Sequence, residues 1–350
     1  MYSATNWIAF RAIGMQRTSY GEFVTFGTAE GDYQSTTIAS QMDSYHRGIK
    51  MSSRTMAPVA GRTISREIAI FFVAVGVVIS AMVALATTTG NEIFAIIGVV
   101  LLGPSVTAMV LTALAKGRRG LRRLLINQIN FRFSVRWYLA AFLVIPAVAL
   151  IALGIRSLFG GPDLAPDTDY SPSSVFPEIV SILIITLVIS LGEELGFRGY
   201  ALPRLQVRLN ALQASLVLGV LWGFWHFPGH LAGMGTPQDM PFYVFMLWVI
   251  PATILITWVY NNSGSVVTAI LMHTAANISF NAIPLIPEMT GTGELTTFWV
   301  FLGVVWTATI AVVIVFGPTH LSRTRSRKTT GHSEEILTTR TYKPVRVVAA

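Results

Sequence analysis

Apolar residues fill runs of about 20 positions between residues 66 and 318, and short polar segments separate these runs. A helix of about 20 apolar residues is long enough to cross the hydrocarbon core of a bilayer. The pattern therefore predicts an all-α fold, a polytopic membrane helix bundle of about eight transmembrane helices. The expected spans are Ile68–Ala86, Ile93–Ala115, Trp137–Phe159, Val175–Gly196, Ala211–His230, Phe242–Tyr260, Val266–Ile283 and Phe298–Phe316.

The composition agrees with a membrane protein. Of the 350 residues, 53% are hydrophobic and 12% are charged, whereas soluble domains carry about 25% charged residues. Cysteine is absent, which excludes disulfides, thiolate zinc sites and a cysteine nucleophile. We attribute the net charge of +8 to loops on the cytoplasmic side of a membrane, and we expect no nucleic-acid partner.

The positions of lysine and arginine predict the topology. Basic residues gather in the segment 116–136, in the segment that follows the fourth span, and in the tail after the eighth span. With eight spans, all three basic segments fall on one side, and the opposite loops are acidic or neutral. By the positive-inside rule, this predicts a multi-pass protein of the cytoplasmic membrane with both termini in the cytoplasm.

Three regions follow from these patterns. Residues 1–65 are polar, without helical period and without a signal-peptide pattern, so we expect a disordered segment or a start-site artefact, with Met51 or Met56 as the natural start. Residues 66–318 form the transmembrane domain, with a motif core at 175–285. Residues 319–350 form a basic cytoplasmic tail.

Glu193, Glu194 and Arg198 lie at the end of the apolar run of the fourth span. On a helix, Glu194 and Arg198 are four residues apart and share a face, so they can form an ion pair. Glu193 points about 100° away and is free to face a cavity. Ionisable residues at membrane depth usually have a function. The alternative is an ordinary charged helix end at the cytoplasmic interface.

The second polar cluster is His226, in an aromatic stretch that begins at Trp222. His230 follows four residues later, as in a two-histidine metal site, but Pro228 between them would distort the helix that such a site requires. We therefore favour His226 alone and interpret His230 as interfacial. The alternative is that His226 has a purely structural role.

The third polar cluster is His273 and Asn277, which share one helix face four residues apart and have small neighbours. Both side chains can donate hydrogen bonds to a developing oxyanion. The alternative is that they only hold helices together. At 1.5 Å per residue, all three clusters can reach one buried cavity, although His226 lies somewhat further out than the others.

The three motifs together resemble the CPBP family, the CAAX-prenyl-protease and bacteriocin-processing (Abi) intramembrane endopeptidases. The motifs are Glu193-Glu194-x-x-x-Arg198, Trp222-x-x-x-His226 and His273-x-x-x-Asn277, each on its own span and in the family's order. The second motif of the family most often opens with phenylalanine, where this chain has Trp222. The resemblance covers roughly residues 175–285.

The resemblance implies a site and a mechanism. Glu193 and His226 would activate a water for attack on an amide carbonyl, while His273 and Asn277 would stabilise the oxyanion. Glu194 and Arg198 would hold the first motif's helix, and Trp222 would support the site. Glu193, His226 and His273 could instead bind zinc with an open coordination position. Between these alternatives we favour the metal-free glutamate mechanism.

The resemblance also implies the partners: the lipid bilayer and a membrane-associated peptide or protein substrate, lipidated in some members of the family. Two other functions remain open from the sequence. One is a catalytically idle membrane scaffold or bacteriocin-immunity protein, which the intact motifs do not favour. The other is a proton-coupled transporter, although no internal repeat is visible in the sequence.

Overall fold

The structure, a computed structural model, describes residues 66–161, 172–237, 239–283, 285–286 and 294–323, together with two short strands near the N-terminus. The chain divides into two compact units, Met1–Ala60 and Gly61–Ala350. In the first unit, β1 (Met15–Arg17) and β2 (Phe23–Thr25) pair antiparallel, with Met15 opposite Thr25. The rest of segment 1–65 and residues 324–350 of the tail lie outside the described residues, so the expectations for them remain predictions.

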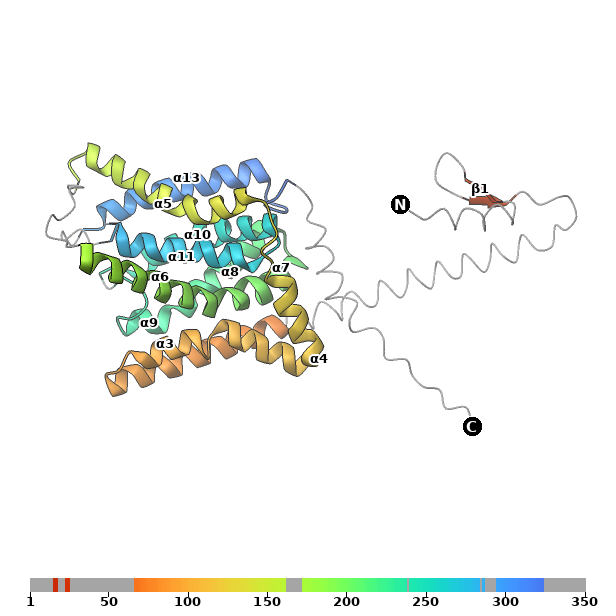
Figure 1. Cartoon of the computed structure of the whole chain (residues 1–350), viewed down its shortest axis with the longest axis horizontal. Coiled ribbons are helices and arrows are strands. Elements are labelled where there is room, and N and C mark those ends of the chain that lie inside the picture. Colours follow the sequence, from red (N-terminus) through yellow and green to blue (C-terminus); the bar gives the residue numbers. More distant parts are fainter. Residues whose placement is uncertain are drawn as a thin grey trace, which may run out of the picture. The chain divides into compact units, whose positions relative to one another are not determined.

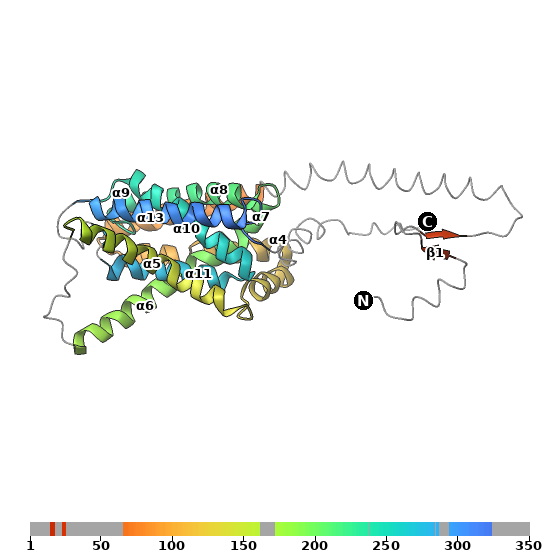
Figure 2. The same cartoon turned by 90° about the horizontal axis from the view of Figure 1, so that it is seen from above.

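The second unit is a bundle of helices, which confirms the all-α class, and its long helices run side by side in both views (Figures 1 and 2). All eight expected spans fall on helices of this bundle. The helices are Arg66–Thr89, α3 (Ile93–Val100), α4 (Pro104–Gln128), α5 (Val135–Leu158), α6 (Pro172–Glu194), the π-helix η1 (Leu195–Ala201), α7 (Leu202–Gln206), α8 (Ala211–Trp225), α9 (Phe227–Leu231), α10 (Phe242–Ser263), α11 (Val266–Ala282) and α13 (Thr296–Phe316).

Five helices of the described residues are long and apolar enough to cross a membrane: Arg66–Thr89, Val135–Leu158, Pro177–Gln206, Phe242–Ser263 and Thr296–Phe316. A sixth span results if α3 and α4, which meet at a bend of 42°, are counted as one. α11 is apolar but shorter, and α8 has only 15 residues. The chain is thus an integral membrane protein, with five or six spans by length and composition where the sequence predicts about eight.

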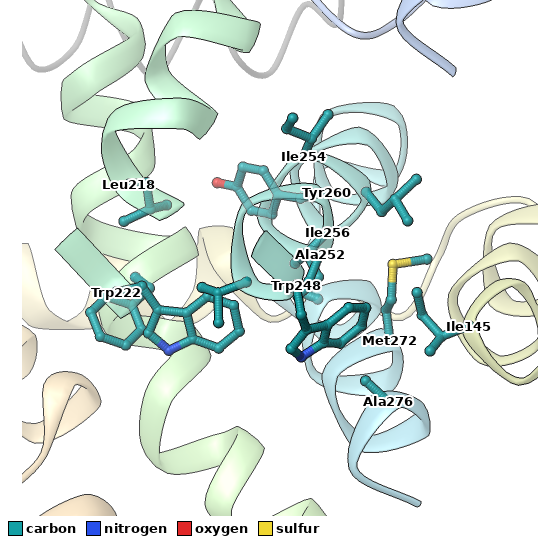
Figure 3. Packing of buried hydrophobic residues seen from close by; sticks show 14 of the residues in the cluster. Ile145, Leu218, Trp222, Trp248, Ala252, Ile254, Ile256, Tyr260, Met272 and Ala276 are labelled. Carbon is teal, nitrogen blue, oxygen red and sulfur yellow. The ribbon is translucent and has the colours of Figure 1, made fainter. Parts of the chain in front are cut away.

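α10 forms the centre of the bundle. Of its apolar window, 72% is buried inside the protein, against 22% for the helix Arg66–Thr89. α10 packs against α8, α11 and α13, and α11 packs against α5 and α6. Figure 3 shows the resulting core, with Leu218 and Trp222 of α8 on one side of α10 and Met272 of α11 near Ile145 of α5. Two of the three motif helices, α8 and α11, therefore lie directly against the most buried helix.

Local sequence signals explain where the motif helices begin and end. α8 begins at a capping box in which the Asn210 side chain accepts from the Gln213 amide at 2.8 Å and Gln213 bonds back. α10 ends at Gly264, whose φ of 65° is left-handed, and Ser265 then caps α11. The tight turn at Gly264 and Ser265 thus joins α10 directly to α11.

Candidate active site

The first motif lies where a long helix changes its winding. α6 ends at Glu194, η1 runs as a π-helix from Leu195 to Ala201, and α7 continues to Gln206. The helix therefore continues past Gly196, where the fourth expected span ends. π-Helical turns are rare and frequently occur at functional sites. Every residue from Gly192 to Leu205 is buried. The two glutamates and Arg198 therefore lie inside the protein and do not form an exposed helix end.

Close packing against the bend between α3 and α4 holds this segment in place. A Cβ at Gly196 would lie 2.3 Å from the carbonyl carbon of Pro104, and one at Gly192 would lie 2.8 Å from the Val99 oxygen. The Ser105 hydroxyl donates to the Leu191 carbonyl at 2.8 Å and accepts from the Gly196 amide at 3.3 Å. This packing role of the two glycines was not predicted, although Gly192 and Gly196 have the G-x-x-x-G spacing typical of close helix contacts.

The Glu194–Arg198 ion pair expected from the i, i+4 spacing is present. Arg198 Nη1 lies 2.7 Å from Glu194 Oε1, and both side chains are fully buried. The same carboxylate oxygen also accepts a hydrogen bond from His273 Nδ1 at 2.8 Å. Glu194 thus joins the first and third motifs, a contact that the sequence analysis did not foresee.

Glu193 is 2% exposed, and Trp222 Nε1 donates to its Oε2 at 2.7 Å. Its Oε1 has no hydrogen-bond partner among the described residues. That Glu193 faces a cavity remains a prediction: its Oε1 is free of hydrogen bonds from the described part of the chain, while its Oε2 is held by the indole of the second motif.

His226 lies at the break between α8 and α9, where Pro228 ends the regular helix as expected. Its Nδ1 is 2.9 Å from the main-chain carbonyl of Trp222. A carbonyl only accepts, so Nδ1 carries the proton, and Nε2 of the neutral ring is an acceptor. The His226 ring also contacts the Trp222 ring, with the ring centroids 5.7 Å apart, so His226 and Glu193 both contact the same tryptophan.

His230 belongs to a different environment. Its Nδ1 lies 2.9 Å from the Thr236 hydroxyl, and its ring contacts Phe242. It is half-buried and does not pair with His226. The choice of His226 over a His226–His230 pair agrees with this geometry.

In the third motif, His273 is buried and Asn277 is half-buried on α11. The Trp222 ring contacts the His273 ring edge to face, with the ring centroids 5.3 Å apart. The side-chain amide of Asn277 has no partner in the part of the chain that the structure describes. It is therefore available to a ligand, whereas His273 is oriented by Glu194.

The structure does not gather the three candidate zinc ligands into a metal site. In the described ranges, no group of three or more histidine, aspartate or glutamate side chains is arranged to hold a metal ion. Glu193, His226 and His273 each make a hydrogen bond to another protein group, from Trp222, to Trp222 and to Glu194 respectively. Metal-binding histidines make such hydrogen bonds as well, so what counts against a zinc site is that the three side chains are not grouped to hold an ion, and the proposed reaction uses no metal.

Comparison with known proteins agrees with the motifs. Residues 175–279 match the family model described as type II CAAX prenyl endopeptidase Rce1-like. The chain is also 28% identical over 190 residues to the CAAX prenyl protease 2 of Methanococcus maripaludis, over 51% of this chain and 69% of that protein. The matched segment contains all three motifs, from Glu193 to Asn277. Through this segment the chain is similar to CAAX prenyl endopeptidases, which supports the resemblance to the CPBP family drawn from the three motifs.

Proposed function

We propose that this protein is an intramembrane endopeptidase that hydrolyses a peptide bond near the C-terminus of a membrane-associated, prenylated protein. The substrate class comes from the matching family model and from the name of the archaeal relative. The observation that carries the proposal is the cluster around Trp222, in which Glu193, Glu194, Arg198 and His273 are buried and His226 is half-buried. Ionisable groups inside a membrane protein are costly and usually functional.

In the proposed reaction, Glu193 Oε1 and His226 Nε2 accept hydrogen bonds from one water molecule. Its oxygen attacks the scissile carbonyl carbon, and its proton passes to the carboxylate or the imidazole. The resulting tetrahedral intermediate collapses when the C–N bond breaks, and the same proton is delivered to the leaving amine. The products are a new carboxylate and a free amine, with no co-reactant besides water.

His273 and Asn277 stabilise the oxyanion in this proposal. The Asn277 amide donates directly. Because His273 Nδ1 already donates to Glu194, its Nε2 can donate only when the ring is an imidazolium. Glu194 fixes the orientation of the His273 ring, and Arg198 holds Glu194 through the same carboxylate oxygen.

The test is a cleavage assay on purified protein in liposomes with a fluorogenic peptide that carries a farnesylated cysteine, compared with the same peptide without the lipid. We expect cleavage of the farnesylated peptide, and a loss of about 10²–10⁴-fold in His226→Ala and His273→Ala. Wild-type rates in the presence of a zinc chelator support water activated by Glu193 and His226. Loss of activity with the chelator and recovery with zinc would contradict that mechanism.

Failure to cleave either peptide would contradict the proposed substrate class. Cleavage of both peptides at equal rates would keep the protease but remove prenylation as a requirement. Equal activity of wild type and His226→Ala would contradict the assignment of the water-activating residues.

A further inference from the structure

Trp222 contacts four of the five ionisable groups of the site. Its indole Nε1 donates to Glu193, its main-chain carbonyl binds His226, its ring face lies 4.4 Å from the guanidinium carbon of Arg198, and its edge meets His273. Figure 3 shows the residue on α8, in the buried cluster beside Leu218 and α10. The main-chain carbonyl would be offered by any residue at this position, whereas the hydrogen bond to Glu193 requires the indole N–H of tryptophan.

We propose that Trp222 is a positioning residue that sets the orientation of both water-activating side chains, Glu193 through its indole N–H and His226 through its carbonyl. The inference rests on the proposed function, since it assigns Glu193 and His226 their roles. Trp222 itself touches neither the water nor the substrate in this account. It acts through the two side chains that do.

The carbonyl of Trp222 is available to His226 because α8 ends there. In a regular α-helix this carbonyl would accept the amide N–H of residue 226. The amide of His226 instead donates to the Gly223 carbonyl at 3.0 Å, in the tighter winding common at helix ends. The Trp222 carbonyl therefore accepts a hydrogen bond from Nδ1 of the His226 ring instead. This hydrogen bond fixes the tautomer and directs Nε2 away from the helix backbone.

The indole is equally constrained. Trp222 is 5% exposed, and its ring is bounded by Arg198, Phe197 and His273. A fixed ring gives its N–H a fixed direction, and the bond to a carboxylate is short at 2.7 Å. It occupies Oε2 of Glu193 and leaves Oε1 for the water. Phenylalanine, which the family's motif most often has at this position, has no N–H. The hydrogen bond to the glutamate is therefore possible only in chains with tryptophan here.

The test compares wild type with Trp222→Phe and with an isosteric replacement of Trp222 by 3-benzothienylalanine, in which sulfur replaces the N–H. We expect kcat to fall about tenfold to a hundredfold in both variants, because one hydrogen bond to a charged group is lost. KM should stay within about twofold of wild type, because Trp222 does not bind the substrate. A purely structural role would instead lower the yield of folded protein and leave kcat of the folded fraction unchanged.

Trp225→Phe is the matched control. Trp225 lies on the same helix, is also 5% exposed, and contacts His226, but its Nε1 donates to the Val75 carbonyl at 3.3 Å. We expect it to keep kcat within about threefold of wild type. Equal kcat in wild type and both Trp222 variants would overturn the inference, as would an equal loss in Trp225→Phe.

The hydrogen bond also has a readout that does not depend on activity, which separates this inference from the proposed function. In protein labelled with ¹⁵N-tryptophan, the indole N–H resonance that Trp222→Phe removes should shift in Glu193→Gln and stay in place in Glu178→Gln. A shift in a protein that cleaves no peptide would support the contact and contradict only the proposed function. No shift would overturn the inference even in an active enzyme.

Discussion

The helix Pro177–Gln206 has two halves that reverse the usual relation between burial and polarity. In the first half most of the exposed side chains are apolar, with Ile184 55% and Ile185 55% exposed. In the second half, from Gly192 to Leu205, the chain is buried and carries two carboxylates and two arginines, all at most 6% exposed. A soluble protein distributes these groups in the opposite way. The first half is built for contact with lipid, and the second half encloses a polar site from which lipid is excluded.

Hydropathy therefore indicates which part of a membrane helix contacts lipid, but it does not indicate how a part that is buried in protein is stabilised. The apolar half can tolerate exposure because lipid chains are as apolar as its own side chains. The polar half must satisfy its charges within the protein, through Glu194, Arg198 and His273.

Arg198→Met should have the largest effect on stability, because it leaves the buried Glu194 carboxylate without its cationic partner. Breaking a buried pair on one side costs about 3–5 kcal/mol. The measurement is the free energy of unfolding in mixed SDS and detergent micelles. The double variant Glu194→Gln/Arg198→Met should recover a large part of the loss. An equal loss in the single and double variants would show that the pair itself is not what stabilises the buried half.

Gly196→Ala should destabilise the protein by about 1–3 kcal/mol, because the new methyl group would overlap the Pro104 main chain and push η1 away from α4. Gly303→Ala is the control, since nothing lies within 4 Å of a Cβ at that position of α13. There we expect no loss, or a gain of about 0.5–1 kcal/mol from helix propensity. Melting temperatures in the same detergent compare the two variants. A Gly196→Ala protein as stable as Gly303→Ala would contradict the close packing.

Ile184→Ala should have the smallest effect, within about 0.5 kcal/mol, because this side chain is exposed in the lipid-facing half. The same unfolding assay measures it beside Leu202→Ala, whose side chain is fully buried in α7 and whose truncation leaves a cavity costing about 2 kcal/mol or more. A loss of similar size at Ile184 would mean that this half of the helix packs against protein.

The sequence predicted much of this architecture because both of its strongest signals are local. Runs of 20 apolar residues identify membrane helices without any knowledge of their neighbours, and all eight expected segments are helical. The i, i+4 spacing of Glu194 and Arg198 predicted their ion pair, and Pro228 predicted the helix break beside His226. Each of these inferences uses only the geometry of one helix.

Contacts between helices could not be predicted in this way. The hydrogen bonds from Trp222 to Glu193 and from His273 to Glu194 span 29 and 79 residues, and no periodicity encodes them. Trp222 stood out only as an unusual residue at its motif position. Five or six helices of the described residues meet the length and composition of a membrane span, against about eight expected, because α8 and α11 are short and gain their burial from α10 and α5. The roles of Glu193, His226, His273 and Asn277 remain predictions from the motifs.

The most direct test of the central claim uses the contrast within the one helix. Glu193→Gln and Glu178→Gln make the same chemical change, the first in the buried half and the second at an exposed position of the lipid-facing half. We would measure cleavage of the farnesylated peptide in H₂¹⁸O by mass spectrometry. The account predicts that Glu178→Gln places ¹⁸O in the new carboxylate at the wild-type rate, while Glu193→Gln does so at least a hundredfold more slowly. Equal rates in the two variants would contradict the claim that Glu193 activates the water.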